Sequence, residues 1–410
     1  MRGIQDIDLS IMPKELLLLL QIINLEKGKD TEKIIDKYFI DIDWELFLEL
    51  ARHHRIYPLV YSKLKILDNK TIPLYVIQTL YQEYKENTYY MLKLSGEMER
   101  VSKLFTENNI RLLFLKGPAI AAEIYGDISL RTSKDLDILI PITDLIEVEK
   151  LLLNCGYVKE EIDPDLTKKK WGSYHVSYYH SQKKIQIEIH WRLFRAPAKE
   201  PSFNELWKRK RVSLLTSYPV YFFGKEDLFF YLVTHGAKHG WFRLRWLADI
   251  DQIIRERNIT NGNYSLLKKY QRHYLVGQAL ILTSQLFATP IHDEILSLTK
   301  EKRSRKLAKL AIFYIVEMSY LNINQLSKES MANYYKFNPF SKKSNLMKSY
   351  LLKLYEFSVR TNIQKFFYIL GLLNPSSADV KTLKLPKSLY FLYFPLRPFL
   401  IFWRKTRRSL

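Results

Sequence analysis

The segment 111–140 constrains the fold of this chain most, because it alternates apolar stretches with turn signals. A short apolar run ends at Gly117, which predicts a buried strand followed by a turn. Pro118 follows at a position where a helix tolerates a missing N–H, and the residues up to Gly126 are compatible with a helix that stops there. A second apolar run at 135–140 predicts another strand. The segment therefore predicts a strand–turn–helix–strand unit of a mixed α/β core.

The second predicted strand carries two carboxylates, Asp135 and Asp137, which the alternation of side chains places on one face. Two close carboxylates repel each other, and a divalent cation such as Mg²⁺ or Mn²⁺ removes that repulsion. The alternative interpretation is an Asp N-cap or a solvated strand edge. The N-terminus of the preceding helix suits an anion such as phosphate. This combination favours a metal-and-triphosphate site.

A third carboxylate, Glu188, lies in a later alternating segment, 183–191, where isoleucines face one side and Gln186, Glu188 and His190 face the other. Together with residues 172–179, this segment predicts two strands separated by a turn. A lone acid on a half-exposed strand is normally solvated. Glu188 is nevertheless a candidate ligand, because a metal site built on two aspartates lacks a third carboxylate.

Length and composition predict two or three domains. A chain of 410 residues is too long for one ordinary core, and 47% hydrophobic residues can fill more than one. The pattern predicts a helical region at 1–108, the α/β core at 109–215, a helical domain at 216–380 and a basic aromatic tail at 381–410. A single cysteine, Cys155, excludes an intrachain disulfide, and the N-terminus lacks the pattern of a signal peptide. These features predict a cytoplasmic location.

The net charge of +21 is concentrated in residues 301–410, which hold 21 Lys and Arg residues against five Asp and Glu residues. Such a basic field suits an anionic partner: nucleic acid, a phosphorylated substrate or an anionic membrane surface. A solvated lysine-rich surface explains the charge equally well. Residues 381–410 combine eight basic residues with many aromatic ones, so this tail either lies in a membrane interface or docks on the helical domain. The first alternative makes the protein peripheral at the membrane.

His235 and His239 are four residues apart, a spacing that places both on one helix face. This spacing occurs in zinc helices, but the intervening residues lack the catalytic Glu of the H-E-x-x-H motif. Packing against the α/β core is therefore the favoured interpretation, and zinc chemistry is the alternative.

Several segments taken together resemble the DNA polymerase β-like nucleotidyltransferase superfamily. They are most similar to a branch of bacterial nucleotidyltransferases found near surface-polysaccharide or modified-peptide gene clusters. The resemblance spans most of the chain, and the combination is more specific than the two aspartates alone. The segments are WELFLELARHHRIYPLVY near the N-terminus, LLFLKG (112–117), YGDISLRTSKDLDILI (125–140), QIEIHW (186–191) and HGAKHGWFRLRWLADI (235–250).

The resemblance implies an α+β fold in which a small mixed β-sheet nucleotidyltransferase core is flanked by N-terminal and C-terminal helical regions. It implies that Asp135, Asp137 and Glu188 bind Mg²⁺ or Mn²⁺, and that Glu188 helps to deprotonate the attacking hydroxyl. The enzyme would move a nucleoside monophosphate from an NTP, such as ATP, to a hydroxyl acceptor, with pyrophosphate leaving. The acceptor could be a sugar, a peptide, a protein or RNA.

The resemblance also implies nucleotide contacts, and one residue departs from the pattern of the superfamily. The implied contacts are Lys116, Gly117, Arg131 and Ser133. His190 would orient Glu188 or a substrate phosphate. The superfamily usually has Ser or Gly after the glycine of the phosphate turn, whereas Pro118 removes both a hydroxyl and a backbone donor. This departure and the basic tail leave an alternative open, a non-catalytic nucleotide- or membrane-binding adaptor that retains the fold.

Overall fold

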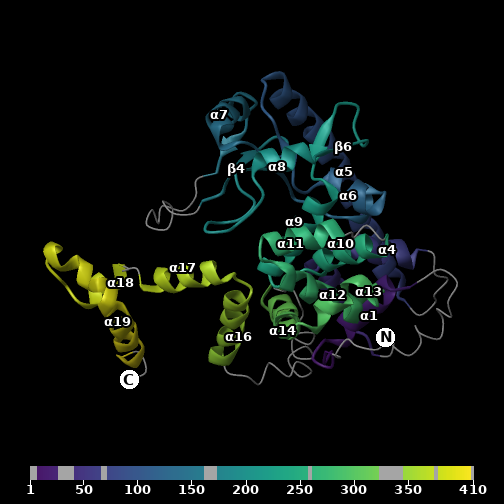
Figure 1. Ribbon diagram of the computed structural model, residues 1–410. Coiled ribbons are helices and arrows are strands. Elements are labelled where there is room, and N and C mark those ends of the chain that lie inside the picture. Colours follow the sequence, from purple (N-terminus) through teal and green to yellow (C-terminus); the bar gives the residue numbers. More distant parts are fainter. Residues whose placement is uncertain are drawn as a thin grey trace. The chain divides into compact units, whose positions relative to one another are not determined.

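A computed structural model describes most of the chain, which divides into two compact units (Figure 1). The larger unit consists of residues 1–195 and 199–359, and the smaller unit consists of residues 196–198 and 360–410. The four-part division expected from the sequence stays a prediction. None of the described helices is long and apolar enough to cross a membrane. The described residues are 7–25, 41–65, 72–160, 173–256, 261–322, 345–373 and 377–407.

A mixed seven-stranded sheet forms the centre of the larger unit, with the strand order β3-β4-β5-β2-β1-β7-β6. β2 runs parallel to β5 and β1 runs parallel to β7, whereas the other neighbours are antiparallel. The predicted α+β fold with a small mixed sheet is therefore confirmed. The strands are β1 (Leu113–Phe114), β2 (Asp135–Leu139), β3 (Val158–Lys159), β4 (His175–His180), β5 (Ile185–His190), β6 (Arg211–Ser213) and β7 (Val220–Phe222).

Helices that precede the sheet in the chain pack with helices that follow it. α1 contacts α12, and α3 contacts α14, so both helical regions contribute to one helical layer (Figure 1). α5 and α6 pack against strands of the sheet. The helices of the larger unit are α1 (Lys14–Ile23), α3 (Trp44–His53), α4 (Tyr57–Leu64), α5 (Leu74–Glu107), α6 (Pro118–Tyr125), α7 (Leu145–Asn154), α8 (Phe203–Lys208), α9 (Lys225–Lys238), α10 (Leu244–Arg255), α11 (Asn261–Lys269), α12 (His273–Phe287), α13 (Asp293–Leu296), α14 (Lys302–Asn322) and α16 (Asn345–Ser358).

The glycine turn after β1 has the conformation that its sequence predicts. Gly117 has a φ of 96°, a region that residues with a Cβ rarely adopt, and it precedes α6. Pro118 occupies the first turn of α6, and Gly126 ends the helix in the left-handed conformation. The predicted strand–turn–helix–strand unit is therefore confirmed.

The register between β2 and β5 aligns the predicted carboxylates. Asp135 lies opposite Gln186, and Asp137 lies opposite Glu188. Leu136 and Ile138 are fully buried, as are the isoleucines of β5, so the apolar face of this strand pair belongs to the core. Alternation along the two strands thus places the carboxylates together on the opposite face.

One stretch of the chain differs from its sequence-based expectation. Residues after 216 were expected to be helical, but β7 pairs through Phe222 with Phe114 of β1, and β6 pairs with β7 at the edge of the sheet. The helical expectation is therefore wrong for Val220–Phe222. The three-residue strand is too short to show a period of two, and its pairing partner lies more than 100 residues earlier in the sequence.

The smaller unit is helical. Within it, Asp379 is fully buried and forms ion pairs with Arg397 and Arg404, at 3.2 Å and 2.6 Å. Its elements are α17 (Asn362–Leu373), α18 (Ser377–Thr382), the 3-10 helix Lys387–Leu392 and α19 (Tyr393–Arg407).

Candidate active site

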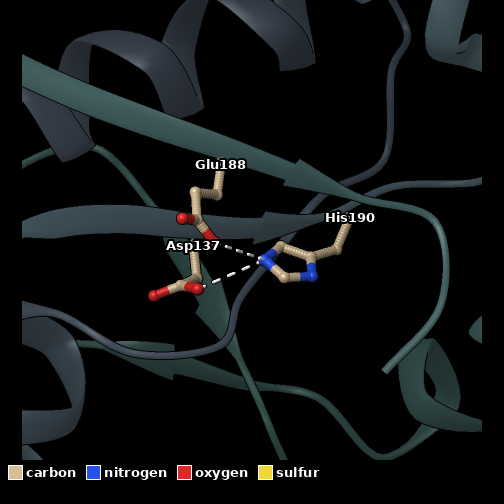
Figure 2. A group of neighbouring side chains, drawn as sticks. All are labelled: Asp137, Glu188 and His190. Atoms are coloured by element: carbon tan, nitrogen blue, oxygen red, sulfur yellow. Dashed lines mark hydrogen bonds and ion pairs between the residues drawn. The ribbon is translucent and has the colours of Figure 1, made fainter. Parts of the chain in front are cut away.

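Asp137 is the centre of a cluster of three side chains on neighbouring strands. Its carboxylate is fully buried, and Glu188 lies beside it in register on β5. His190, two residues after Glu188, brings its Nε2 to 3.2 Å from Asp137 Oδ1 and 3.4 Å from Glu188 Oε2. Figure 2 shows the three side chains pointing toward one another, with one nitrogen of the imidazole facing both carboxylates. The strand register therefore creates the cluster directly.

This cluster has the composition of a metal site. One potential ligand atom from each of the three residues lies within 4.8 Å of the other two. Asp137 Oδ2 and His190 Nδ1 are both buried and have no hydrogen-bond partner. A buried carboxylate oxygen without a donor is costly, and a cation next to it removes that cost. The residues present therefore fit a divalent metal ion.

Lys116 supplies a positive charge to the same carboxylate. Its Nζ donates to Asp137 Oδ1 at 3.0 Å, and its side chain keeps 16% of its surface exposed. Burial alone would raise the pKa of Asp137, but Lys116 and His190 hold it below its usual value. The predicted residue Lys116 thus lies in the cluster, directly before Gly117.

Asp135 lies on the same strand in a different environment. Asp135 is half-buried, and it is not part of the cluster of potential metal ligands that Asp137, Glu188 and His190 form. Burial raises its pKa, and the negative charges of Asp137 and Glu188 raise it further. We call Asp135, Asp137 and Glu188 the carboxylate row. Its buried end lies at Asp137, and its more exposed end lies at Asp135.

The other two predicted nucleotide contacts lie in the segment before β2. Arg131 is 1% exposed, and its Nε donates to Asp249 Oδ1 at 3.0 Å. Tyr125 donates to the same oxygen at 3.0 Å, which completes a buried network between α6, α10 and this segment. Ser133 is also buried, and its Oγ donates to the backbone carbonyl of Asp135 at 3.1 Å. The structure therefore holds Arg131 in an ion pair with Asp249.

His235 and His239 lie among aromatic rings. Their ring centroids are 4.7 Å apart, and Trp246 lies 5.4 Å from the first and 5.3 Å from the second. Burial lowers the pKa of both, that of His239 to about 3. Among the described residues, the group of potential metal ligands is the Asp137 cluster, so no third ligand joins these two histidines. Packing, the favoured interpretation, agrees with this environment.

Two aspects of the site were missed by the sequence reasoning. His190 was expected to orient Glu188 or a substrate phosphate, although its position on the carboxylate face of β5 was a signal for a ligand. Its ring also stacks on His175 of β4, with centroids 4.9 Å apart. The second aspect is a group of cations beside Asp135, which includes Arg55. The sequence carried no signal for that group, because its members are distant in the chain.

Comparison with known proteins agrees with the geometry. The family described as "uncharacterised nucleotidyltransferase" matches residues 41–288, which run from the start of α3 to the end of α12 and contain the whole sheet. No curated protein and no solved structure matches the chain. The match covers more than half of the chain and confirms the resemblance inferred from the sequence. The protein therefore belongs to this family and is a nucleotidyltransferase.

Proposed function

We propose that the protein is a metal-dependent nucleotidyltransferase that moves a nucleoside monophosphate from an NTP to a hydroxyl acceptor and releases pyrophosphate. The observation that carries this proposal is the register that pairs Asp137 with Glu188 and adds His190 within 4.8 Å, on the sheet of a nucleotidyltransferase family member. ATP is the donor to test first. The acceptor is a hydroxyl of a sugar, a peptide, a protein or RNA.

Asp137, Glu188 and His190 would hold a Mg²⁺ or Mn²⁺ ion, and Asp135 would add a carboxylate at the more exposed end of the row. When bound, such an ion stabilises negative charge on the triphosphate and lowers the pKa of an acceptor hydroxyl. The unpartnered Asp137 Oδ2 supports this assignment, because it is buried and available as a ligand atom. The buried Asp137 thereby anchors the site, while Asp135 faces the substrates.

Glu188 is the residue suited to accept the proton of the acceptor hydroxyl. Its side chain is 22% exposed, so an acceptor can reach it, whereas the carboxylate of Asp137 is closed to solvent. A general base must lie within hydrogen-bond reach of the proton that it takes. His190 lies 3.4 Å from Glu188 Oε2 and is a positioning residue for that carboxylate.

Lys116 is suited to contact the transferred phosphate. It lies at the end of β1, next to the glycine turn, and its ammonium group is already at the carboxylate row. A lysine at this position offers three donors to phosphate oxygens. We propose Gly117 and Ser133 as further nucleotide contacts through the turn and the strand entry. Arg131 supports the site from its ion pair with Asp249 rather than through the nucleotide.

We propose that the protein acts in the cytoplasm and that residues 381–410 contact an anionic membrane surface. Phe399 and Phe402 are 72% and 70% exposed, and Trp403 is 54% exposed. The three lie at helical spacing on α19, in a tail without acidic residues after Asp379. Sedimentation with phosphatidylserine vesicles tests this contact. Loss of binding in Phe399→Ser/Phe402→Ser supports it, and unchanged binding refutes it.

Nucleotidyl transfer is tested with NTPs labelled at the α-phosphate, incubated with Mg²⁺ and cell extract. We expect wild type to transfer label to an acceptor, and Asp137→Asn to transfer none. Glu147→Gln is the matched control, because Glu147 is an exposed carboxylate on α7 whose loss should leave transfer unchanged. Equal labelling by wild type and Asp137→Asn, or no labelling with any NTP, would contradict the proposal. The second outcome would favour a nucleotide-binding adaptor.

A further inference from the structure

Three cationic side chains gather beside Asp135 from distant parts of the chain. Arg55 lies between α3 and α4, Lys134 directly precedes β2, and Arg243 directly precedes α10. Arg55 interacts electrostatically with Arg243 and Asp135, and Lys134 interacts with all of these groups. We call Arg55, Lys134 and Arg243 the cation group. The fold therefore collects three positive charges around one carboxylate.

A cavity of about 490 Å³ is lined by two members of this group, Arg55 and Lys134. Arg55, Ser133 and Lys134 line it from the segments around Asp135. Gln186 also lines it, and this residue lies opposite Asp135 in the sheet register. The remaining residues include aromatic side chains suited to pack against a substrate: Tyr57, Tyr90 and Tyr179. The cavity thus continues the face of the sheet that carries Asp137 and Glu188.

The cation group lacks the neutralisation that other arginines of the site have. Arg52 also lines the cavity, but it forms ion pairs with Glu49 and Glu83. In the part of the chain that the structure describes, no member of the cation group has an ion pair with a carboxylate, and Arg243 Nε is buried without a hydrogen-bond partner. Lys184 and the carboxylate of Glu86 also line the cavity, so the cations around it still outnumber the carboxylates and leave a local excess of positive charge.

This excess has a cost that an anion would remove. Arg55 and Arg243 are both half-buried, and burial together with the charge of Arg243 lowers the pKa of Arg55 to about 10. Like charges that are partly withdrawn from water destabilise one another, and a multiply charged ligand between them reverses the effect. Guanidinium groups match phosphate oxygens through paired N–H donors. A phosphate-bearing ligand is therefore the best complement to the group.

We propose that Arg55, Lys134 and Arg243 form a phosphate-binding subsite at the Asp135 end of the carboxylate row. This inference rests on the proposed nucleotidyl transfer, and it adds side-chain donors to a site whose glycine turn lacks the backbone donor that Pro118 removes. The phosphate belongs either to the NTP or to a phosphorylated acceptor. Both sources share the same chemistry, and competition between ligands separates them.

The test is isothermal titration of the full-length protein with inorganic tripolyphosphate in the absence of metal. We expect Arg55→Gln and Arg243→Gln each to weaken binding about tenfold, because each removes charge-assisted hydrogen bonds. Arg111→Gln is the matched control, since Arg111 is an exposed arginine outside the cavity. Adenosine, which has no phosphate, should bind wild type and the three variants with the same affinity. Unchanged tripolyphosphate affinity in both Arg55→Gln and Arg243→Gln would overturn the subsite.

Two further measurements complete the design. Arg243→Lys keeps the charge but loses the paired N–H donors, so its affinity should lie between that of wild type and that of Arg243→Gln. Circular dichroism spectra equal to that of wild type show that the variants fold, and an affinity of Arg243→Lys no higher than that of Arg243→Gln would contradict a role for the charge. Saturating ATP and Mg²⁺ should displace tripolyphosphate if the subsite holds the donor, and should leave it bound if the subsite holds a phosphorylated acceptor. The transfer assay with Asp137→Asn is independent of these titrations. Failure of the subsite and failure of nucleotidyl transfer are therefore distinguishable.

Discussion

Arg131 and the pair Arg55 and Arg243 all lie near the carboxylates of the sheet, but they differ in whether a carboxylate neutralises their charge. Arg131 is 1% exposed and forms an ion pair with Asp249, whose side chain is fully buried. Its Nη2 also donates to Asp249 Oδ2, at 3.1 Å. Arg55 and Arg243 are half-buried, and among the described residues neither forms an ion pair with a carboxylate. The charge of Arg131 is neutralised by a carboxylate inside the protein, although its Nη1 is buried without a hydrogen-bond partner, whereas Arg55 and Arg243 form no ion pair among the described residues.

This difference separates a structural role from a binding role. A buried ion pair holds segments together, and the loss of one partner leaves an unpaired charge. A set of like charges without a partner contributes no such stability, and its arrangement is explained by a ligand that supplies the missing charge. The resemblance to nucleotidyltransferases implied a nucleotide contact for Arg131, and the sequence does not show that Asp249 neutralises this residue.

The largest expected effect comes from removing the carboxylate at the centre of the row. Asp137→Asn keeps the shape of the side chain and removes the charge that a divalent cation requires. We expect the rate of nucleotidyl transfer to fall about 10⁴-fold, which corresponds to about 5 kcal/mol of transition-state free energy. Initial rates with labelled NTP measure the loss. A rate within tenfold of wild type would place the chemistry elsewhere.

Removing one partner of the ion pair between Arg131 and Asp249 should lower the stability of the fold. Asp249→Asn leaves Arg131 buried with its charge unpaired, and we expect the free energy of unfolding to fall by about 3–5 kcal/mol. Urea denaturation followed by circular dichroism measures the change. Replacing both partners, as in Arg131→Met/Asp249→Leu, should restore much of this stability. Asp249→Asn with an unchanged urea midpoint would remove the structural assignment of Arg131.

Glu97 is a second buried charged residue whose charge is neutralised by its neighbours, and its contribution to the stability of the protein depends on pH. Burial alone would raise the pKa of Glu97, but hydrogen bonds from three donors lower it to about 2. A folded-state pKa below the unfolded value stabilises the protein above about pH 4.5, and this stabilisation is lost as the pH falls toward 2. The donors are Arg100, Lys183 and Tyr157.

Glu97→Gln therefore tests whether a buried charge that its neighbours neutralise stabilises the protein, because the loss of stability should depend on pH. We expect the variant to be less stable than wild type by about 2 kcal/mol at pH 6, and this difference to shrink between pH 5 and pH 2. Urea denaturation at several pH values checks this result. A difference that stays constant over that range would show that the carboxylate charge is not responsible.

The smallest expected effect is the effect of the unsatisfied arginines on stability. Arg55→Gln and Arg243→Gln remove repulsion and no ion pair, so we expect the free energy of unfolding without ligand to change by less than about 1 kcal/mol. Urea denaturation without phosphate in the buffer is the measurement. A loss comparable to that of Asp249→Asn would mean that these arginines hold the fold together, and the comparison would fail.

The sequence predicted the parts of this molecule that depend on local pattern. Alternation identified β2 and β5, and the glycine and proline residues identified the turn and the start of α6. The cluster around Asp137 could be assembled because its members lie on two recognisable strands. Its geometry also shows why His190 belongs to it, since the residue lies on the carboxylate face two positions after Glu188.

The remaining features depend on contacts between distant segments. Arg131 and Asp249 are 118 residues apart, and no local pattern connects them. The cation group combines residues 55, 134 and 243, which meet only after three segments have packed. Single-sequence reasoning identifies the strand that carries a carboxylate, but it does not identify which arginine is neutralised by the fold.

The central claim is that the carboxylate row binds a metal ion together with the nucleotide. Calorimetric titration of ATP with and without Mg²⁺, in wild type and in Asp135→Asn/Asp137→Asn, tests it most directly. We expect Mg²⁺ to tighten ATP binding to wild type by about tenfold or more, and the double variant to lose this dependence while it retains binding of tripolyphosphate. Equal ATP affinity with and without Mg²⁺ in wild type would contradict the claim.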